Sequence, residues 1–270
     1  MNSRSVSRSL MVALAVTLGS AAAFAQVAAP AKPFEPQVGQ GGKDVVWVPT
    51  PQALVDKMLD MAKVTPADFV MDLGSGDGRT VITAAKRGSR AVGIEYNPDM
   101  VELSKKNAEA AGVSDKATFM KADLFETDLT KAQVITMFLL PTINMKLRPT
   151  ILNLKPGTRI VSNTFTMEDW EADETATIGD ACTGSWCTAL LWIVPAKVDG
   201  TWQMPQGTLT LTQKFQKIAG RLGTQEITEA KLRGNQISFK VGSVTYGGTV
   251  DGSTIKGTGG SGGSWTATKK

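Results

Sequence analysis

The segment VMDLGSGDG, residues 70–78, constrains the fold of this chain more than any other. It begins with apolar residues that predict a buried strand over 69–73, and its three glycines lead into a predicted helix over 78–87. A helix N-terminus behind such a turn favours negative charge. A dinucleotide-binding turn carries G-x-G-x-x-G, whereas here the third glycine comes one residue early and Arg79 holds the expected position. The segment therefore predicts a strand, a turn and a helix that approach a ligand other than a dinucleotide.

Strands and helices alternate along most of the chain. Further strands are predicted over 91–94, 118–121, 134–140 and 159–162, and further helices over 52–63, 98–111 and 142–154. Unbroken apolar strands in such an alternation are typical of a parallel sheet that is covered on both faces. Two final strands, 175–178 and 188–194, resemble a hairpin. We therefore expect an α/β fold, a Rossmann-like, doubly wound and mostly parallel sheet with a terminal antiparallel hairpin.

Acidic residues stand at three successive strand ends. Asp72 closes the first strand, Glu95 follows the second, and Asp123 follows the third, with Leu124 beside it. A carboxylate at each place suits a different group of one ligand: a cationic amino group, two ribose hydroxyls, and an adenine amino group on whose ring Leu124 can pack. This constellation predicts a site for S-adenosylmethionine (AdoMet). The alternative is an unrelated α/β sheet with ordinary polar residues at its strand ends.

Several segments resemble class I AdoMet-dependent methyltransferases, and they cover about 46–195. The closest resemblance is to small protein-lysine methyltransferases, the branch that includes mitochondrial enzymes acting on the ATP synthase c subunit and the adenine nucleotide translocator, with partial similarity to Dot1-type enzymes. The segments are DLGSGDGR (72–79), GIE (93–95), Asp123, LKPGTRIVS (154–162), VPTP (48–51) with the helix after it, and TFTMEDW (164–170). A predicted export signal and an added C-terminal β domain depart from that family.

The resemblance implies an enzyme that binds AdoMet and transfers its methyl group in line to a neutral nucleophile. The expected donor-binding residues are Pro49, Thr50, Asp72, Gly74, Ser75, Gly76, Gly78, Glu95, Asp123 and Leu124. Tyr96, Thr142 and Asn144 are candidate catalytic residues that would orient the acceptor, although ring packing, a helix cap or a surface polar position would also explain them. A protein lysine amine is the expected acceptor. A small-molecule acceptor, and a non-catalytic exported module that binds AdoMet or a nucleoside, are the alternatives.

The chain has two cysteines, Cys182 and Cys187, and no histidine. Two thiols are too few for a tetrahedral zinc site, so no metal is expected. The missing histidine also removes the commonest general base and every Ser–His or Cys–His catalytic pair. Four residues that read as a turn separate the cysteines, and such a close pair usually bonds in an oxidising compartment. We therefore expect a hairpin that is closed by a disulfide.

The first 25 residues have the features of a cleavable signal peptide. Arg4 and Arg8 precede an apolar run over 10–18, and the small residues Ala23 and Ala25 flank a cleavage site. The alternative is an N-terminal anchor that is not cleaved. Residues 26–45 are rich in Ala, Pro, Gly and Gln, which predicts a flexible lead-in. The sequence therefore predicts a periplasmic or secreted protein with no stable membrane insertion after the signal is removed.

The last 71 residues differ in composition from those before them. Residues 26–199 carry 18 Lys and Arg against 22 Asp and Glu, a net charge of −4, whereas 200–270 carry 9 against 3, a net charge of +6. Alternating apolar residues and frequent glycines predict a small antiparallel β domain over 200–270, a meander or partial barrel, after a methyltransferase domain over 46–197. No nucleic acid partner is expected, because basic residues often dot the exposed face of a small sheet.

Overall fold

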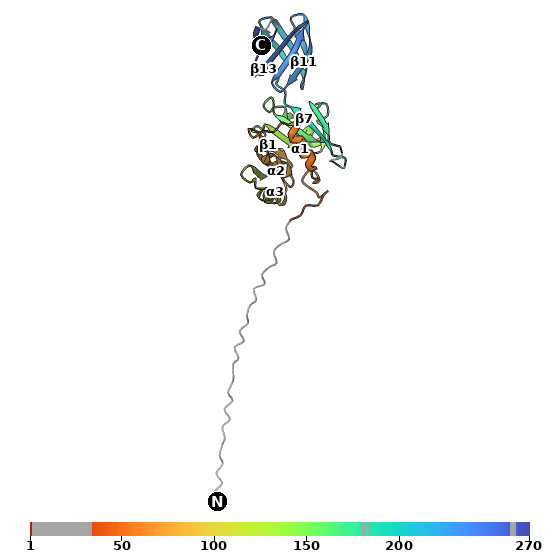
Figure 1. Ribbon diagram of the computed structural model, residues 1–270, viewed down its shortest axis with the longest axis vertical. Coiled ribbons are helices and arrows are strands. Elements are labelled where there is room, and N and C mark those ends of the chain that lie inside the picture. The colour runs from red at the N-terminus through yellow and green to blue at the C-terminus, as the bar shows by residue number, and fades with distance from the viewer. Residues whose placement is uncertain (2–33, 180–181, 183, 260–262) are drawn as a thin grey trace. The chain divides into compact units, whose positions relative to one another are not determined.

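The computed structural model describes Met1 and residues 34–179, 182, 184–259 and 263–270 (Figure 1). Apart from Met1, the predicted signal peptide over 1–25 lies outside the described residues. The chain from Phe34 to Lys270 forms one compact unit. It contains an α/β region followed by an all-β barrel. Within the described residues, no helix is both long and apolar enough to cross a membrane.

A seven-stranded sheet forms the centre of the α/β region, and its strand order is β3-β2-β1-β4-β5-β7-β6. Neighbouring strands from β3 to β5 are parallel, whereas β7 is antiparallel to both β5 and β6. This arrangement confirms the predicted Rossmann-like sheet with a terminal antiparallel hairpin. The strands are β1 (Phe69–Leu73), β2 (Arg90–Glu95), β3 (Ala117–Lys121), β4 (Val134–Met137), β5 (Arg159–Asn163), β6 (Glu174–Thr177) and β7 (Thr188–Ile193).

Helices and two apolar clusters cover the sheet. The helices are α1 (Gln52–Met61), α2 (Arg79–Lys86), α3 (Pro98–Ala110) and α4 (Pro141–Ile151). One cluster joins Leu54 of α1 and Val81 of α2 to the strands, and another joins Leu147 of α4 to Leu73 and Ile135. The central strands are almost wholly apolar because they lie between these two clusters.

The N-cap of α1 is Pro51, which makes no side-chain cap bond, and the neighbouring Thr50 hydroxyl accepts a 3.3 Å hydrogen bond from the Asn163 amide. One predicted strand end differs from the structure. Strand β4 ends at Met137 rather than at residue 140, because Leu140 is already the N-cap of α4 and Pro141 occupies its first turn. Phe138 therefore leaves the sheet at the end of β4.

The C-terminal residues form a closed barrel of eight strands rather than an open meander. Each strand pairs antiparallel with the next, and β15 pairs with β8 to close the barrel. The interior is filled with apolar side chains, among them Trp202 and a group in which Phe239 stacks on Tyr246 and Trp265 meets both rings at their edges. The strands are β8 (Gly200–Met204), β9 (Gly207–Lys214), β10 (Lys217–Leu222), β11 (Gln225–Arg233), β12 (Gln236–Val241), β13 (Val244–Asp251), β14 (Thr254–Gly259) and β15 (Gly263–Lys269).

The N-terminal segment from Gln37 to Trp47 is a small hairpin. The Gly39 amide donates to the Trp47 carbonyl at 2.8 Å, the Trp47 amide donates to Gln40 at 2.9 Å, and Gly41 bridges to Val46. The sequence predicts a flexible lead-in over 26–45, but the described part of it from Phe34 contains most of this hairpin. Backbone hydrogen bonds, and not an apolar face, hold this hairpin together, so the amino-acid composition does not predict the hairpin.

The predicted disulfide between Cys182 and Cys187 is present, and their Cα atoms are 5.8 Å apart. It closes the connection between β6 and β7, immediately before β7 begins at Thr188. The bond therefore restrains the residues that enter β7 at one edge of the sheet.

Candidate active site

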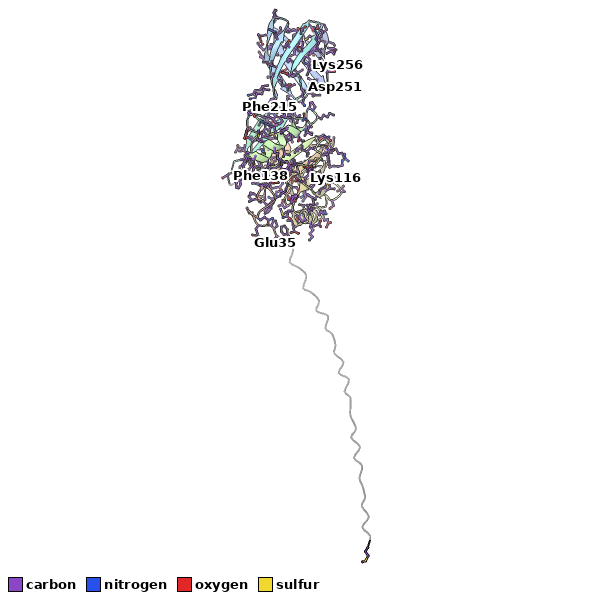
Figure 2. The ribbon with its side chains drawn as sticks, turned by 180° about the vertical axis from the view of Figure 1, so that it is seen from behind. Glu35, Lys116, Phe138, Phe215, Asp251 and Lys256 are labelled. Carbon is purple, nitrogen blue, oxygen red and sulfur yellow. A yellow bond between two sulfur atoms is a disulfide. The ribbon has the colours of Figure 1, made fainter. Side chains whose placement is uncertain are left out.

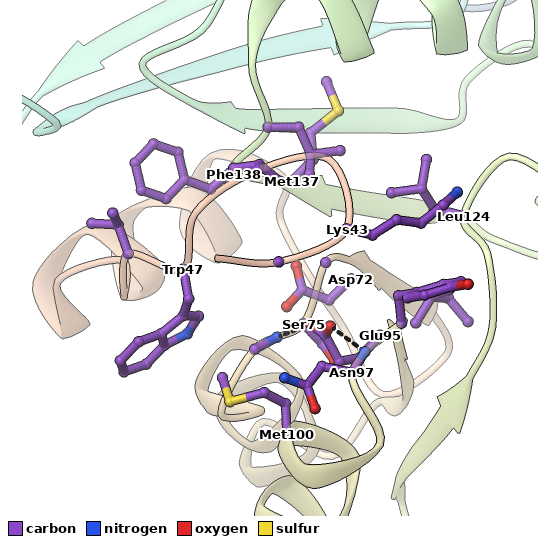
Figure 3. Close-up of a pocket in the computed structure, with 18 of the residues that line it drawn as sticks. Lys43, Trp47, Asp72, Ser75, Glu95, Asn97, Met100, Leu124, Met137 and Phe138 are labelled. Carbon is purple, nitrogen blue, oxygen red and sulfur yellow. Dashed lines mark hydrogen bonds between the residues drawn. The ribbon is translucent and has the colours of Figure 1, made fainter. Parts of the chain in front are cut away.

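A pocket lies at the carboxyl ends of β1, β2 and β3, where parallel strands bring their last residues to one edge of the sheet (Figure 3). The residues that line it all fall between Gln40 and Ile143. They come from the strand ends, the glycine turn, the start of α3 and the N-terminal hairpin. The predicted ligand-binding turn and the three acidic strand ends therefore meet in one cavity.

The glycine turn after β1 forms the floor of this pocket. Gly76 has φ of +54°, and a Cβ placed on it would lie 2.6 Å from Nε1 of Trp47. Any larger residue would displace the Trp47 ring, so glycine is required at this position. Gly74 and Ser75 also line the pocket. Gly78 lies behind the turn, where a Cβ would meet the Phe119 ring at 2.7 Å.

Asp72 is buried at the end of β1 and faces the pocket (Figure 3). Burial raises the pKa of its carboxyl to about 7, and the neighbouring carboxylates of Asp77 and Glu95 act in the same direction. Against them, the Thr136 hydroxyl donates a 2.6 Å hydrogen bond to Oδ1 and favours the ionised form. A cationic group that enters the pocket would supply the missing counter-charge for this carboxylate.

Glu95 lies at the end of β2 with both carboxylate oxygens engaged by backbone amides. Oε2 accepts from the Gly76 amide and Oε1 accepts from the Asn97 amide, each at 2.9 Å (Figure 3). These bonds hold the carboxylate in one orientation at the pocket wall. Each oxygen has a further lone pair, so the carboxylate can also accept two hydroxyl groups of a ligand.

Asp123 follows β3 and is paired with a residue of the N-terminal hairpin. Lys43 Nζ donates to Oδ2 at 2.5 Å, and this hydrogen bond holds the pKa of the carboxyl below its ordinary value. The Lys43 ammonium also lies 5.1 Å from the centre of the Tyr96 ring. The hairpin therefore contacts the pocket at the end that Asp123 and Leu124 form.

AdoMet fits the polar groups that the pocket leaves available. Asp72 lacks a cationic partner among the described residues, and Glu95 retains acceptor capacity. These two carboxylates match a ligand with one amino group and two hydroxyls. Ser75 also belongs to the pocket wall, but its hydroxyl oxygen is fully buried and has no hydrogen-bond partner in the described structure.

The remaining predicted residues lie in different surroundings. Pro49, Thr50 and Tyr96 line the pocket, and the Tyr96 side chain is 50% exposed. Thr142 is exposed in the first turn of α4. Asn144 is buried instead, and its amide nitrogen donates to the carbonyls of Phe165 and Thr166. The structure thus places Asn144 as a support for the turn after β5.

Sequence reasoning did not identify Lys43, Trp47 or Phe138, which also line the pocket (Figure 3). Lys43 falls in the predicted lead-in, and Trp47 stands at the start of the predicted methyltransferase domain, before its first helix; neither residue has a periodic pattern around it. Phe138 is part of the apolar run 134–140, which indicates only a buried strand. One usable signal is Trp47 itself, since it directly precedes the VPTP segment that carries part of the family resemblance.

The family model, the relatives and the solved structure that match this chain are all methyltransferases. The family model described as the ANTKMT methyltransferase domain matches residues 72–174. A protein-lysine N-methyltransferase of Saccharolobus islandicus is 44% identical over 139 residues, which are 50% of this chain and 86% of that protein. The adenine nucleotide translocase lysine N-methyltransferase of Mus musculus is 33% identical over 134 residues, which are 49% of this chain and 57% of the mouse protein. The chain therefore spans little more than half the length of that relative.

A solved structure is similar over the same region. It is an RNA methyltransferase from Salinibacter ruber in complex with S-adenosyl-L-homocysteine, with 45% sequence identity and a TM-score of 0.52. The similarity covers 56% of this chain and 96% of that one. The names of these relatives give different acceptors, protein lysine for two of them and RNA for the third.

Proposed function

We propose that this chain, which belongs to the protein-lysine N-methyltransferase family and is an AdoMet-dependent enzyme, methylates lysine side chains of another protein. One observation carries the donor half of this proposal. The carboxylates of Asp72, Glu95 and Asp123 end three neighbouring parallel strands and line one pocket beside the glycine turn.

Each carboxylate is assigned the ligand group that its surroundings favour. Asp72, buried and without a cationic partner in the described structure, would bind the amino group; Glu95, oriented by two amides, would bind the ribose hydroxyls. Asp123 would accept from the adenine amino group, with Leu124 against the ring. AdoMet, when bound, supplies a methyl group on a positively charged sulfur. The chain itself positions the donor and excludes water from it.

A lysine amine is the acceptor that this site can use without a dedicated base. The chain has no histidine, and a lysine only has to lose one proton, which water can accept. The acidic α/β region, with a net charge of −4 over 26–199, also suits a basic protein segment better than a phosphate backbone.

RNA is the second candidate acceptor, because the Salinibacter ruber relative is named an RNA methyltransferase. Labelled AdoMet and a cell extract separate the two possibilities. Label that resists ribonuclease, is released by protease and appears as methyl-lysine after hydrolysis supports a protein acceptor. Label that ribonuclease removes would replace the lysine proposal with the RNA one, and label in neither polymer would favour a small-molecule acceptor.

Donor binding is tested separately by titration with S-adenosylhomocysteine. Glu95→Ala removes the proposed ribose contact and is expected to weaken binding by about 1–3 kcal/mol. Glu102→Ala is the matched control, because Glu102 lies on α3, is exposed and pairs only with Lys105 in the described structure. Unchanged affinity in a Glu95→Ala and Asp123→Ala double variant would contradict the donor assignment.

We also propose that the enzyme acts outside the cytosol. Two features support this: the signal-like residues 1–25 and the Cys182–Cys187 disulfide, a bond typical of oxidising compartments. Cell fractionation of the full chain and of a chain that begins at residue 26 provides the test. We expect the full chain in the periplasmic or secreted fraction and the shortened chain in the cytosol. A full chain found in the cytosol with free thiols would refute this location.

A further inference from the structure

We propose that three aromatic side chains, Phe138, Phe165 and Trp186, form the binding site for the aliphatic stem and the ammonium of the acceptor lysine. The inference rests on the proposed function, since it names the part of the site that would receive the lysine. The donor residues account for only one half of the sheet edge, and these rings occupy the other half.

The strand order places the three rings beside the donor pocket. Phe138 directly follows β4, and Phe165 lies two residues after the end of β5. Strand β7 runs antiparallel to β5, with Asn163 opposite Ala189, so the start of β7 lies at the carboxyl end of β5. Trp186, two residues before β7, therefore reaches the same edge. The donor carboxylates end β1, β2 and β3, and the aromatic residues continue that row at β4, β5 and β7.

The rings contact one another and open to solvent. Phe138 and Phe165 stack with centroids 5.8 Å apart, and Trp186 meets Phe138 edge to face at 6.0 Å. Phe138 also lines the donor pocket, so the two sites share this side chain (Figure 3). The Trp186 side chain is 41% exposed, and the two phenylalanines are half-buried. An apolar surface of this kind beside a ligand pocket indicates a binding site.

The turn that carries Phe165 is held firmly. Thr164 has φ of +58°, a strained value for a β-branched residue. The Phe165 carbonyl accepts hydrogen bonds from the Asn144 amide at 3.2 Å and from the Ser162 hydroxyl at 2.7 Å. Strain that the surrounding structure maintains often marks a functional position. Asn144 is thus a positioning residue that orients the turn behind Phe165.

The Cys182–Cys187 disulfide holds Trp186 in a short closed loop, adjacent to Cys187. A fixed aromatic ring loses little conformational entropy when a ligand binds. The chemistry of the three rings matches lysine in particular. Their faces attract an ammonium group through cation–π interactions and pack against its aliphatic stem. A carboxylate or phosphate ligand would find no cationic partner among these three side chains.

The test uses the oxidised full chain saturated with S-adenosylhomocysteine and labelled with nitrogen-15 at tryptophan. The probe is Nα-acetyl-lysine methylamide, and its norleucine analogue has the stem without the ammonium. We expect the lysine probe to shift the Trp186 indole resonance, which Trp186→Phe identifies, and to leave those of Trp202 and Trp265 in the barrel unchanged. We expect the norleucine probe to bind at least fivefold more weakly. An unmoved Trp186 resonance, or equal affinity for both probes, would overturn the proposal.

Variants compared by saturation-transfer NMR of the probe give a second readout. Trp186→Ala is expected to weaken probe binding about tenfold, whereas Trp186→Phe keeps most of the affinity and Phe34→Ala, an exposed aromatic control, has no effect. Affinity for S-adenosylhomocysteine should stay constant in all three. Failure of the wild type to bind S-adenosylhomocysteine would instead reject the proposed function. Normal donor binding with equal probe affinity in Trp186→Ala would reject only the aromatic site.

Discussion

The α/β region and the barrel bury different kinds of side chain. In the described chain, the buried polar and charged side chains lie between Thr50 and Asn163, whereas the barrel interior is filled by apolar and aromatic residues. A buried polar group costs stability unless it is paired, and Ser75 and Asp72 remain incompletely compensated. The α/β region therefore concentrates the buried polar side chains, among them the Asp72 carboxyl that lines the pocket, whereas the described barrel core is built from apolar and aromatic side chains.

Ion pairs between the two regions join basic side chains of the barrel to acidic side chains of the α/β region. Lys217 of the barrel pairs with Glu171 at 2.6 Å, and Lys214 pairs with Asp169 at 3.2 Å. Phe215, labelled in Figure 2, stacks on the buried Trp170 with centroids 5.8 Å apart. None of the residues in these contacts lines the donor pocket. The barrel thus covers an apolar side chain of the α/β region without entering the donor pocket.

The largest effect on stability is expected from a change inside the barrel. Trp265 is 3% exposed and packs against Phe239 and Tyr246. Trp265→Ala leaves a large cavity and should lower the free energy of unfolding by about 3–5 kcal/mol. Denaturant unfolding measures the loss, and titration should show unchanged affinity for S-adenosylhomocysteine at a temperature where the variant is folded. Weaker donor binding in the folded variant would show that the barrel core affects the donor pocket, contrary to the proposed separation of the two regions.

Asp72→Asn is expected to raise the free energy of unfolding, whereas Trp265→Ala lowers it. The folded-state pKa of about 7 lies above the ordinary aspartate value of 3.8, so the folded chain retains a proton that the unfolded chain loses. Wild-type stability is therefore lost as pH rises from about 4 to 7. The variant should gain about 2–4 kcal/mol above pH 7 and almost nothing near pH 4. Denaturant unfolding of both proteins across this pH range measures the gain.

The affinity for S-adenosylhomocysteine should also depend on the ionisation of Asp72. In the wild type, affinity for S-adenosylhomocysteine should rise with pH up to about 7, because the amino group requires ionised Asp72. Asp72→Asn should bind weakly at every pH. If the variant gains no stability at pH 8, burial does not destabilise the ionised Asp72 carboxylate. If the variant binds S-adenosylhomocysteine with normal affinity, Asp72 does not contact the donor.

A double Cys182→Ser and Cys187→Ser variant should cost about 2 kcal/mol, near the low end for a disulfide because the loop is short. Thermal unfolding measures this loss against wild type, with donor affinity unchanged. The lysine probe should bind more weakly, since Trp186 loses its restraint. Unchanged probe binding would mean that the loop orients Trp186 without the bond.

The smallest effect is expected from removing the barrel. A chain that ends at residue 197 should stay folded and bind S-adenosylhomocysteine within about twofold of the full chain, because the donor pocket is built from residues 40–143. It should also aggregate more readily, as Trp170 loses the cover of Phe215. A folded fragment with lost donor binding would place the barrel in the active site.

Local pattern alone was sufficient for the α/β region and for bringing its three acidic strand ends together. Strand–helix alternation predicts the parallel sheet, and parallel strands must bring their carboxyl ends to one edge, so the sequence was enough to group Asp72, Glu95 and Asp123. The assignment of these side chains to AdoMet stays a prediction that the titrations test.

Only the tertiary structure decided which residues complete the site. Lys43 and Asp123 are separated by 80 positions, and no local pattern records their pairing. Phe138, Phe165 and Trp186 come together because β7 enters the sheet antiparallel beside β5. Closure of the barrel depends on the pairing of its first and last strands, β8 and β15. Periodicity reports which face of an element is buried, whereas contacts between distant segments depend on strand order and chain direction, and these arise only when the whole chain packs.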